Sequence, residues 1–351
     1  MRVVMTLLVR DEADIIDAQL AFHLNAGVDF VVATDNRSED GTTEILERYE
    51  RAGFLHLIRE DGEATRQSEW VTRMARKAAT EFDADWVLNA DADEFWWPRG
   101  GSLKDVLTVI PERYGVVRGC WRHFLPRPTA SAYSFFAERM TVRLCLPAHP
   151  GDKATIFHAH QKVAHRADPN VTIEEGNHNA FGDRLEPVRV WHPIEVLHFS
   201  LRSRAQLERK SRGGWLRNRD REPVLHESLL EKASCSGLLD EYYESFVVRY
   251  EALARGLADG TLAMDTRLRD ALRTLRTEDG GFRLPCSSGA GALSFPRPGV
   301  GEDAVYAGEA SVLVEIDGVV RAESRVDSLE TRLASLERGP LTRLRHRLAP
   351  R

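Results

Sequence analysis

Residues 86–95 read Trp-Val-Leu-Asn-Ala-Asp-Ala-Asp-Glu-Phe, a short apolar run that ends in three carboxylates. Such a run is typical of a buried β-strand. Three similar runs precede it, at 3–9, 30–34 and 54–58, and the segments between them, at 13–25, 42–51 and 65–82, have the periodicity of amphipathic helices. This alternation predicts a βαβαβαβ order and therefore an α/β fold with a sheet flanked by helices.

Polar residues follow three of the four expected strands. Arg10-Asp11-Glu12 comes after the first, Asp35-Asn36 after the second, and Asp91-Ala92-Asp93-Glu94 after the fourth. Open α/β sheets bind ligands at the carboxyl ends of their strands, so we expect the three clusters to form one site. Two carboxylates at i and i+2 can hold a hard divalent cation, and such a cation can neutralise a diphosphate leaving group. A solvated acidic turn is the alternative interpretation of the acidic cluster.

Composition excludes several classes of function. The chain has 351 residues, with 48 basic and 54 acidic side chains interspersed, which gives a net charge of −6 and no basic field for nucleic acid. The four cysteines are far apart and form no C-x-x-C pair, which argues against a zinc ribbon or a disulfide framework. The apolar run at 3–9 is too short for a membrane span. We therefore expect a bacterial protein of the cytoplasm, the bacterial origin being inferred from the excess of Arg over Lys.

The ordered series of motifs resembles the family 2-like glycosyltransferases of the GT-A fold. The matching branch reads R-N-E after its first strand, D-N-x-S-x-D-G-T after its second and D-x-D-E-F after its fourth. The corresponding residues here are Arg10-Asp11-Glu12, Asp35-Asn36-Arg37-Ser38-Glu39-Asp40-Gly41-Thr42 and Asp91-Ala92-Asp93-Glu94-Phe95. Lys162, Gly176-Asn177-His178, His198-Phe199-Ser200-Leu201-Arg202-Ser203 and Lys210 resemble the later K, G-N-H and H-Y-x-x-R-S motifs. Asp11 stands where the branch has Asn, and Phe199 where it has Tyr.

This resemblance, which covers roughly residues 1–215, implies a GT-A-like (Rossmann-like) mixed sheet with a C-terminal helical extension. It also implies transfer of a sugar from a nucleoside diphosphate sugar, UDP-sugar favoured, with inversion, to a glycan or lipid-linked acceptor. Asp91, Asp93 and a later His would hold Mn²⁺ or Mg²⁺. His198 is the first choice for that His, and a core His bonded to backbone is the equal alternative. His178 competes, as a metal ligand or as an acceptor contact.

We expect the donor to be bound by residues from several strand ends and by two later arginines. These are Arg10, Glu12, Asp35, Asn36, Arg66, Asp91 and Arg202. Asp35 would reach the base or ribose, and Arg66 and Arg202 the phosphates. A solvated helix charge is the alternative for Arg66, and Asp40 is interpreted as the N-cap of the second helix.

An inverting transfer needs a carboxylate that accepts the proton of the acceptor hydroxyl. Glu94, Glu174, Glu175 and Asp183 are all candidates. Glu175 is preferred because it lies in the segment expected to face the acceptor.

We expect the catalytic domain to span 1–283, with a nucleotide-sugar-binding half (1–113), an acceptor side (114–215) and a helical part (216–283). Residues 284–301 are rich in Gly, Pro and Ser, as linkers are. In the tail, 302–351, Val326, Leu329, Leu333 and Leu336 follow a heptad spacing, and a basic end follows. The tail could pair with a second copy, pack on the body, contact the inner face of the anionic cell membrane, or fray in solvent.

Two other functions stay open at this stage. A nucleotidyltransferase also combines a metal with an α/β sheet, but the segment 9–12 lacks the Gly-rich phosphate loop of that class. A non-catalytic interaction protein could act through the C-terminal helix. The intact Asp91, Asp93 and His198 argue against a decayed enzyme.

Overall fold

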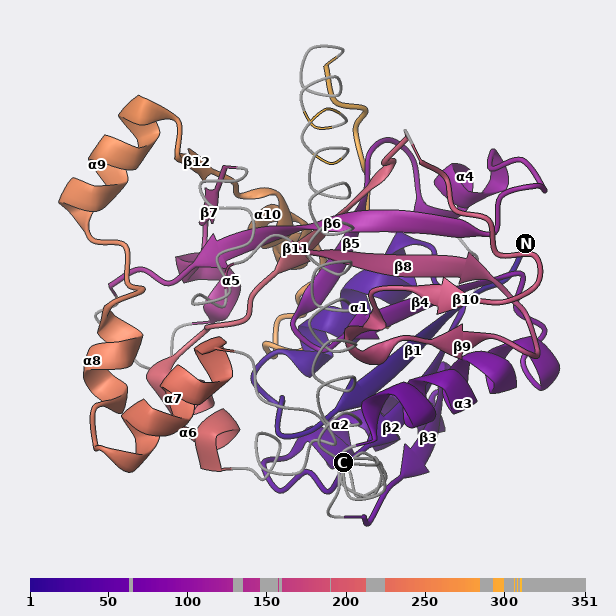
Figure 1. Ribbon diagram of the computed structural model, residues 1–351, viewed down its shortest axis with the longest axis horizontal. Coiled ribbons are helices and arrows are strands. Elements are labelled where there is room, and N and C mark those ends of the chain that lie inside the picture. Colours follow the sequence, from indigo (N-terminus) through magenta and orange to yellow (C-terminus); the bar gives the residue numbers. More distant parts are fainter. Residues whose placement is uncertain are drawn as a thin grey trace, which may run out of the picture.

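The computed structural model describes residues 1–62, 66–128, 135–145, 157, 160–189, 191–212, 225–284, 293–299, 306, 308 and 310. Within them the chain forms a large mixed sheet with helices on both faces (Figure 1). The α/β class expected from the sequence is confirmed.

The first part of the chain has the βαβαβαβ order. Its elements are β1 (Val3–Val9), α1 (Ile16–Ala26), β2 (Phe30–Asp35), α2 (Thr42–Arg51), β3 (Leu55–Arg59), α3 (Gln67–Thr80) and β4 (Trp86–Asp91). Strand β1 is central and pairs in parallel with β2 and β4, and β3 pairs in parallel with β2. The bounds differ from the expected ones by a few residues, most at α1, which begins at Ile16 rather than at residue 13.

The second part extends the same sheet with antiparallel strands. The elements up to residue 198 are β5 (Glu94–Pro98), α4 (Leu103–Thr108), β6 (Val116–Leu125), α5 (Phe136–Arg139), β7 (Val142–Leu144), β8 (Gln161–Arg166), β9 (Thr172–Ile173), the 3₁₀ turn η1 (Glu175–Asn177), β10 (Ala180–Phe181) and β11 (Ile194–His198). Strand β8 lies between β4 and β6 and is antiparallel to both. Strand β11 pairs with β5 and with β6. The small β9–β10 hairpin lies against α3.

Helices dominate after residue 200. They are α6 (Arg204–Arg212), α7 (Leu225–Cys235), α8 (Leu239–Glu244), α9 (Tyr250–Asp259) and α10 (Arg267–Leu275), with the short strand β12 (Leu262–Met264) before α10. Helices α6, α7 and α8 gather at one side of the sheet, away from α3 (Figure 1), around Leu201, Leu207, Leu230 and Leu239. Helix α10 packs on α1.

Alternation along β1 divides the core between the two faces of the sheet. Val3, Met5, Leu7 and Val9 join the larger cluster with α1, whereas Val4 joins the cluster under α3. Successive strand residues point to opposite faces, so a strand covered on both sides is mostly apolar. Thr6, the polar residue of β1, is buried and donates to Asn89 Oδ1 at 2.8 Å. This is why the run at 3–9 shows no polar alternation.

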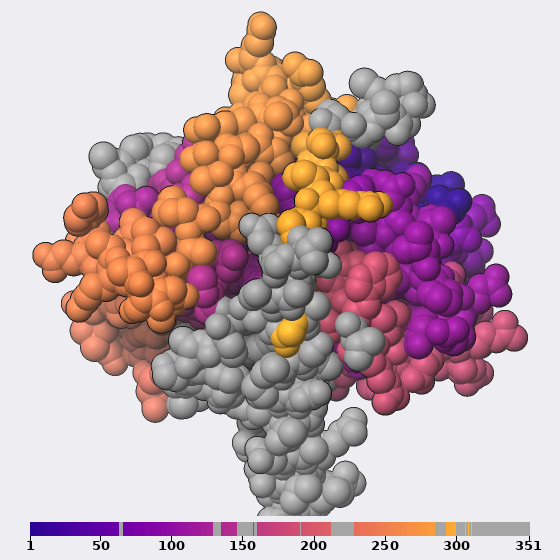
Figure 2. Space-filling view, turned by 90° about the horizontal axis from the view of Figure 1, so that it is seen from above, coloured from indigo at the N-terminus to yellow at the C-terminus, as the bar shows by residue number. Residues whose placement is uncertain are grey.

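The segment after α10 contacts the body through an aromatic residue. Phe295 is 6% exposed, its ring lies 4.9 Å from that of Trp97, and its carbonyl accepts a hydrogen bond from the backbone N–H of Gly101 at 3.0 Å. Figure 2 shows residues 293–299, in yellow, lying against the body. The heptad positions 326–336 and the basic end lie outside the described residues, so the domain boundaries and the coiled coil remain predictions. No helix in the described part of the chain is long and apolar enough to cross a membrane.

Candidate functional site

The sheet register brings the polar strand ends together. Val9, the last residue of β1, is paired with Asp35 of β2, and its neighbour Leu8 is paired with Asp91 of β4. Arg10 follows directly. The polar residues at the ends of β1, β2 and β4 therefore lie next to one another at the carboxyl edge of the sheet.

His198 reaches the acidic turn through two strand pairings. Strand β5 begins at Glu94, directly after the turn at Asp93, and its antiparallel partner β11 places His198 opposite Glu94. The His198 Nε2 lies 3.6 Å from Asp93 Oδ1, and its Nδ1 lies 3.2 Å from Nδ1 of His123 on β6. The imidazole also stacks on Trp121 at 4.3 Å between ring centroids. These partners are side chains, and within the described part of the chain the imidazole of His198 makes no hydrogen bond to a backbone group of the kind that a core His would make.

A buried lysine holds the other two carboxylates. Lys162 on β8 is 1% exposed, and its Nζ lies 2.5 Å from Asp91 Oδ2 and 3.0 Å from Glu94 Oε1. The Asn177 amide of η1 donates to Asp91 Oδ1 at 3.0 Å. Glu94 also accepts from the Trp121 indole N–H at 2.7 Å and from the backbone N–H of Asp91. Burial raises the pKa of Glu94 to about 7, although the ammonium of Lys162 opposes that shift.

A second ionic cluster lies on the other side of Asp93. Arg202 is fully buried, donates to both oxygens of Asp14 at 2.8 and 3.0 Å, and contacts Glu12. Lys210 on α6 lies 3.1 Å from Asp93 Oδ2 and 3.6 Å from Glu12 Oε1. Burial would raise the pKa of Asp93, but the charges of Lys210, His198 and Arg202 hold that pKa well below its usual value. Asp93 is therefore ionised throughout the neutral range.

Asp35 organises the loop after β2. Its carboxylate accepts from Ser38 N at 3.1 Å, from Ser38 Oγ at 2.6 Å and from Thr43 Oγ1 at 2.5 Å, and the residue is 3% exposed. The Asn36 amide donates toward the backbone carbonyl of Gly62 at 3.3 Å.

The interpretation of Asp40 as the N-cap of α2 is wrong by one position. The cap is Gly41, whose φ of 99° lies in the left-handed region open to glycine. The Asp40 carboxylate instead accepts from Thr42 N at 3.1 Å and from Ala13 N at 3.0 Å, and so ties this loop to the one after β1.

The remaining predicted site residues lie in loops and turns. Arg66 precedes α3, is exposed and lies 3.5 Å from Glu69. Glu175 is exposed on η1, and Asp183 is exposed in the turn after β10. The His178 ring stacks on His160 with 3.3 Å between centroids, and its Nδ1 lies 2.7 Å from the carbonyl of Gln161.

Trp121 and His123 were missed in the sequence. Both sit in β6, which lies beyond the four strands predicted from the sequence, and they join the site because β11 pairs beside them. Lys162, Asn177 and Lys210 belong to motifs noted in the sequence, but the motifs alone assign them no contact.

A divalent cation bound by Asp93 and His198 would be held only partly by the protein. The described residues contain no group of three or more His, Cys, Asp or Glu side chains that could hold a metal. They do contain the pair Asp93 Oδ1 and His198 Nε2, 3.6 Å apart. Mg²⁺ commonly binds through one or two protein groups and completes its coordination with substrate phosphates and water. Asp91 fits less well as a metal ligand, because Lys162 and Asn177 contact its two oxygens.

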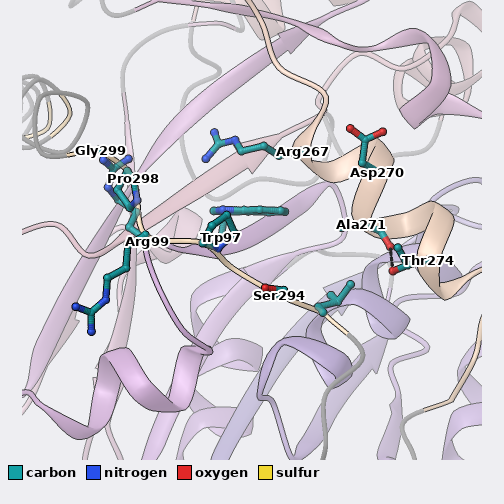
Figure 3. Close-up of a pocket in the computed structure, with 12 residues that line it drawn as sticks. Trp97, Arg99, Arg267, Asp270, Ala271, Thr274, Ser294, Pro298 and Gly299 are labelled. Carbon is teal, nitrogen blue, oxygen red and sulfur yellow. Dashed lines mark hydrogen bonds between the residues drawn. The ribbon is translucent and has the colours of Figure 1, made fainter.

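A separate cavity of about 520 Å³ lies at the other end of β5 (Figure 3). Trp97 and Arg99 line it together with residues of α10, among them Arg267, and with residues of the segment 293–299. Arg267 lies 2.6 Å from Glu195 and Arg99 lies 2.5 Å from the same carboxylate. These arginines thus have carboxylate partners within the protein, and none of the predicted site residues lines the cavity.

No family model matches the chain, and no curated protein matches it. Among solved structures, *S. aureus* TarS (residues 1–349) in complex with UDP-GlcNAc matches with 14% identity over 70% of this chain and 74% of that chain, at a TM-score of 0.34. Glucosyl-3-phosphoglycerate synthase from *Mycobacterium tuberculosis*, in complex with Mn²⁺, UDP and glucosyl-3-phosphoglycerate, matches with 19% identity over 34% and 44%, at 0.26. A 4-diphosphocytidyl-2C-methyl-D-erythritol synthase matches with 12% identity over 47% and 75%, at 0.28. All three TM-scores lie below 0.5.

Proposed function

We propose that this chain is a glycosyltransferase that takes a sugar from a nucleoside diphosphate sugar, UDP-sugar favoured, and passes it to a glycan or lipid-linked acceptor. The observation that carries the proposal is the meeting of Asp93 with His198 at the edge where β1, β2 and β4 end. This edge is where open α/β sheets bind nucleotides. Asp93 and His198 would hold Mn²⁺ or Mg²⁺, which would neutralise the leaving diphosphate.

The residues around this pair have distinct tasks in the proposal. Asp93 stays ionised at neutral pH and so remains a ligand for a cation. Asp91 has a side chain that is 29% exposed, and Lys162 and Asn177 fix its orientation. We assign Asp91 to a hydroxyl of the donor rather than to the metal, because the buried Lys162 and Asn177 already contact both of its oxygens. In Asp93 the neighbouring cations Lys210 and Arg202 face Oδ2, whereas Oδ1 faces His198. An oxygen of Asp91 can still accept a further hydrogen bond.

Glu175 is our candidate for the base that takes the acceptor proton. It is exposed, and it lies in η1, the same turn from which Asn177 contacts Asp91. Glu94 has a pKa near neutrality but is 0% exposed and accepts from Trp121, Lys162 and a backbone N–H, so an acceptor hydroxyl could not reach it. We assign Glu94 to positioning the turn.

Thermal unfolding with UDP, with and without Mn²⁺, tests the proposal. UDP should stabilise the protein only when Mn²⁺ is present, because otherwise the diphosphate would face Asp91 and Asp93 as like charges. A ligand at 100 times its Kd adds about 2.7 kcal/mol. The Asp93→Asn variant should lose this shift, whereas Asp279→Asn, a change at an exposed residue after α10, should keep it. Equal stabilisation by UDP in EDTA and in Mn²⁺ would refute the metal assignment.

A further inference from the structure

Two cationic side chains contact Asp93, and they differ in how freely they can move. Arg202 Nη1 lies 3.8 Å from Asp93 Oδ2, and Lys210 Nζ lies 3.1 Å from the same oxygen. A metal ion at Asp93 and His198 would have to share this carboxylate with both of them. Whether either cation can leave is decided by its other contacts.

Arg202 is locked in place. Its side chain is 0% exposed, its Nε and Nη2 contact Asp14, and its Nη1 donates to the carbonyl of Phe199 at 3.1 Å. Moving this guanidinium would leave buried carboxylates without a partner, which is strongly unfavourable.

Lys210 is much less constrained. Its side chain is 29% exposed, and among the described residues it contacts Asp93 at 3.1 Å and Glu12 at 3.6 Å. An ammonium on a four-carbon stem can rotate toward another acceptor without breaking a fixed pair of bonds. Glu12 keeps Arg202 as a partner if Lys210 turns away.

Among the described residues, four carboxylates and three cations make up this cluster. Glu12, Asp14, Asp40 and Asp93 face Arg202, Arg209 and Lys210, with Arg209 3.3 Å from Asp14 and 3.9 Å from Asp40. A divalent cation added beside Asp93 would turn this excess of one negative charge into an excess of one positive charge, and it would repel the nearby ammonium. A diphosphate carries negative charge that offsets the added cation.

We propose that Lys210 occupies Asp93 when the donor is absent, yields that carboxylate to the divalent cation, and then binds the diphosphate of the donor. This inference rests on the proposed function. Lys210 would then compete with the metal for Asp93 and also bind the phosphates. The same side chain would weaken the binding of the metal and strengthen the binding of the nucleotide. A lysine remote from Asp93 would produce neither.

The test measures two dissociation constants by titration calorimetry. Mn²⁺ is titrated into the full chain without nucleotide, and UDP is then titrated at saturating Mn²⁺. Lys210→Met should bind Mn²⁺ roughly tenfold more tightly and UDP roughly tenfold more weakly than the wild type, each corresponding to about 1.4 kcal/mol. Lys210→Arg should retain most of the UDP affinity. Lys104→Met removes a lysine that pairs with Asp29 beyond the opposite end of the parallel strands, and should change neither constant.

The outcomes separate the inference from the function on which it rests. If the wild type binds neither Mn²⁺ nor UDP, the proposed function fails. If the wild type binds both, and Lys210→Met leaves either constant unchanged or moves it in the other direction, Lys210 does not have the double role and the inference is overturned. Circular dichroism of Lys210→Met verifies that the variant is folded. If it is not folded, Lys210→Gln replaces it with the same expected signs.

Discussion

The buried Lys162 provides a quantitative test of how the charges of the site are held. Its Nζ lies between Asp91 and Glu94, and Lys162 and Glu94 are almost completely buried. Lys162→Met keeps the length of the side chain but removes the positive charge, which leaves Glu94 buried without its cation. Removing one partner of a buried ion pair costs about 3–5 kcal/mol.

The chain contains a matched exposed pair. Lys77 Nζ lies 2.6 Å from Glu81 on the surface of α3, with side chains 27% and 53% exposed. Its distance is close to the 2.5 Å between Lys162 and Asp91, so the main difference is burial. Exposed i,i+4 pairs contribute only about 0.3–0.5 kcal/mol, so Lys77→Met should cost no more than that.

Urea unfolding followed by tryptophan fluorescence distinguishes the two variants. With a slope of about 3 kcal/mol/M, Lys162→Met should lower the midpoint by about 1 M or more, and Lys77→Met by about 0.2 M or less. The pKa of Lys162 is raised in the folded state, so its contribution is fully present below the unfolded pKa and is lost only as pH rises through the higher folded value. The pKa of Glu94 is raised to about 7, so a measurement at pH 8.5, above that value and below the pKa of Lys162, keeps both partners charged. If Lys162→Met costs no more than Lys77→Met, the description of Lys162 as an essential buried counter-charge is wrong.

Three further predictions follow from the site and the tail. Asp93→Asn should reduce sugar transfer about 100-fold or more while leaving the circular dichroism spectrum unchanged, and wild-type rates would mean that the acidic turn has no role in the reaction. Glu175→Gln should lower turnover by about 100-fold or more with unchanged UDP affinity, and if Asp183→Asn shows the loss instead, Asp183 is the base. Removing 311–351, which keeps the buried Tyr306 and Ala310, should leave hydrolysis of the donor nearly unchanged but produce a smaller species in light scattering or release the protein from anionic liposomes, and a truncated chain that matches the full chain in both assays would exclude both roles for the tail.

The order of the first seven elements was determined by the sequence itself. Apolar runs of a few residues alternate with segments of helical period, and these two signals are local, so they can be recognised without knowing the fold. The same holds for the polar residues after β1, β2 and β4, because parallel strands must end at a common edge. The pairing of Val9 with Asp35, and of Leu8 with Asp91, agrees with that rule.

Only the tertiary structure decided which side chains surround those strand ends. His198 meets Asp93 because β11 pairs with β5, and Lys162 meets Asp91 because β8 enters the sheet between β4 and β6. Both pairings join strands far apart in the sequence, and no periodicity or spacing encodes the register of a non-local pair. The same limit applies to Phe295, which lies in a Gly-rich and Pro-rich segment and is nevertheless buried against Trp97. Composition reports the average character of a segment, whereas burial depends on the surface that the rest of the chain presents to it.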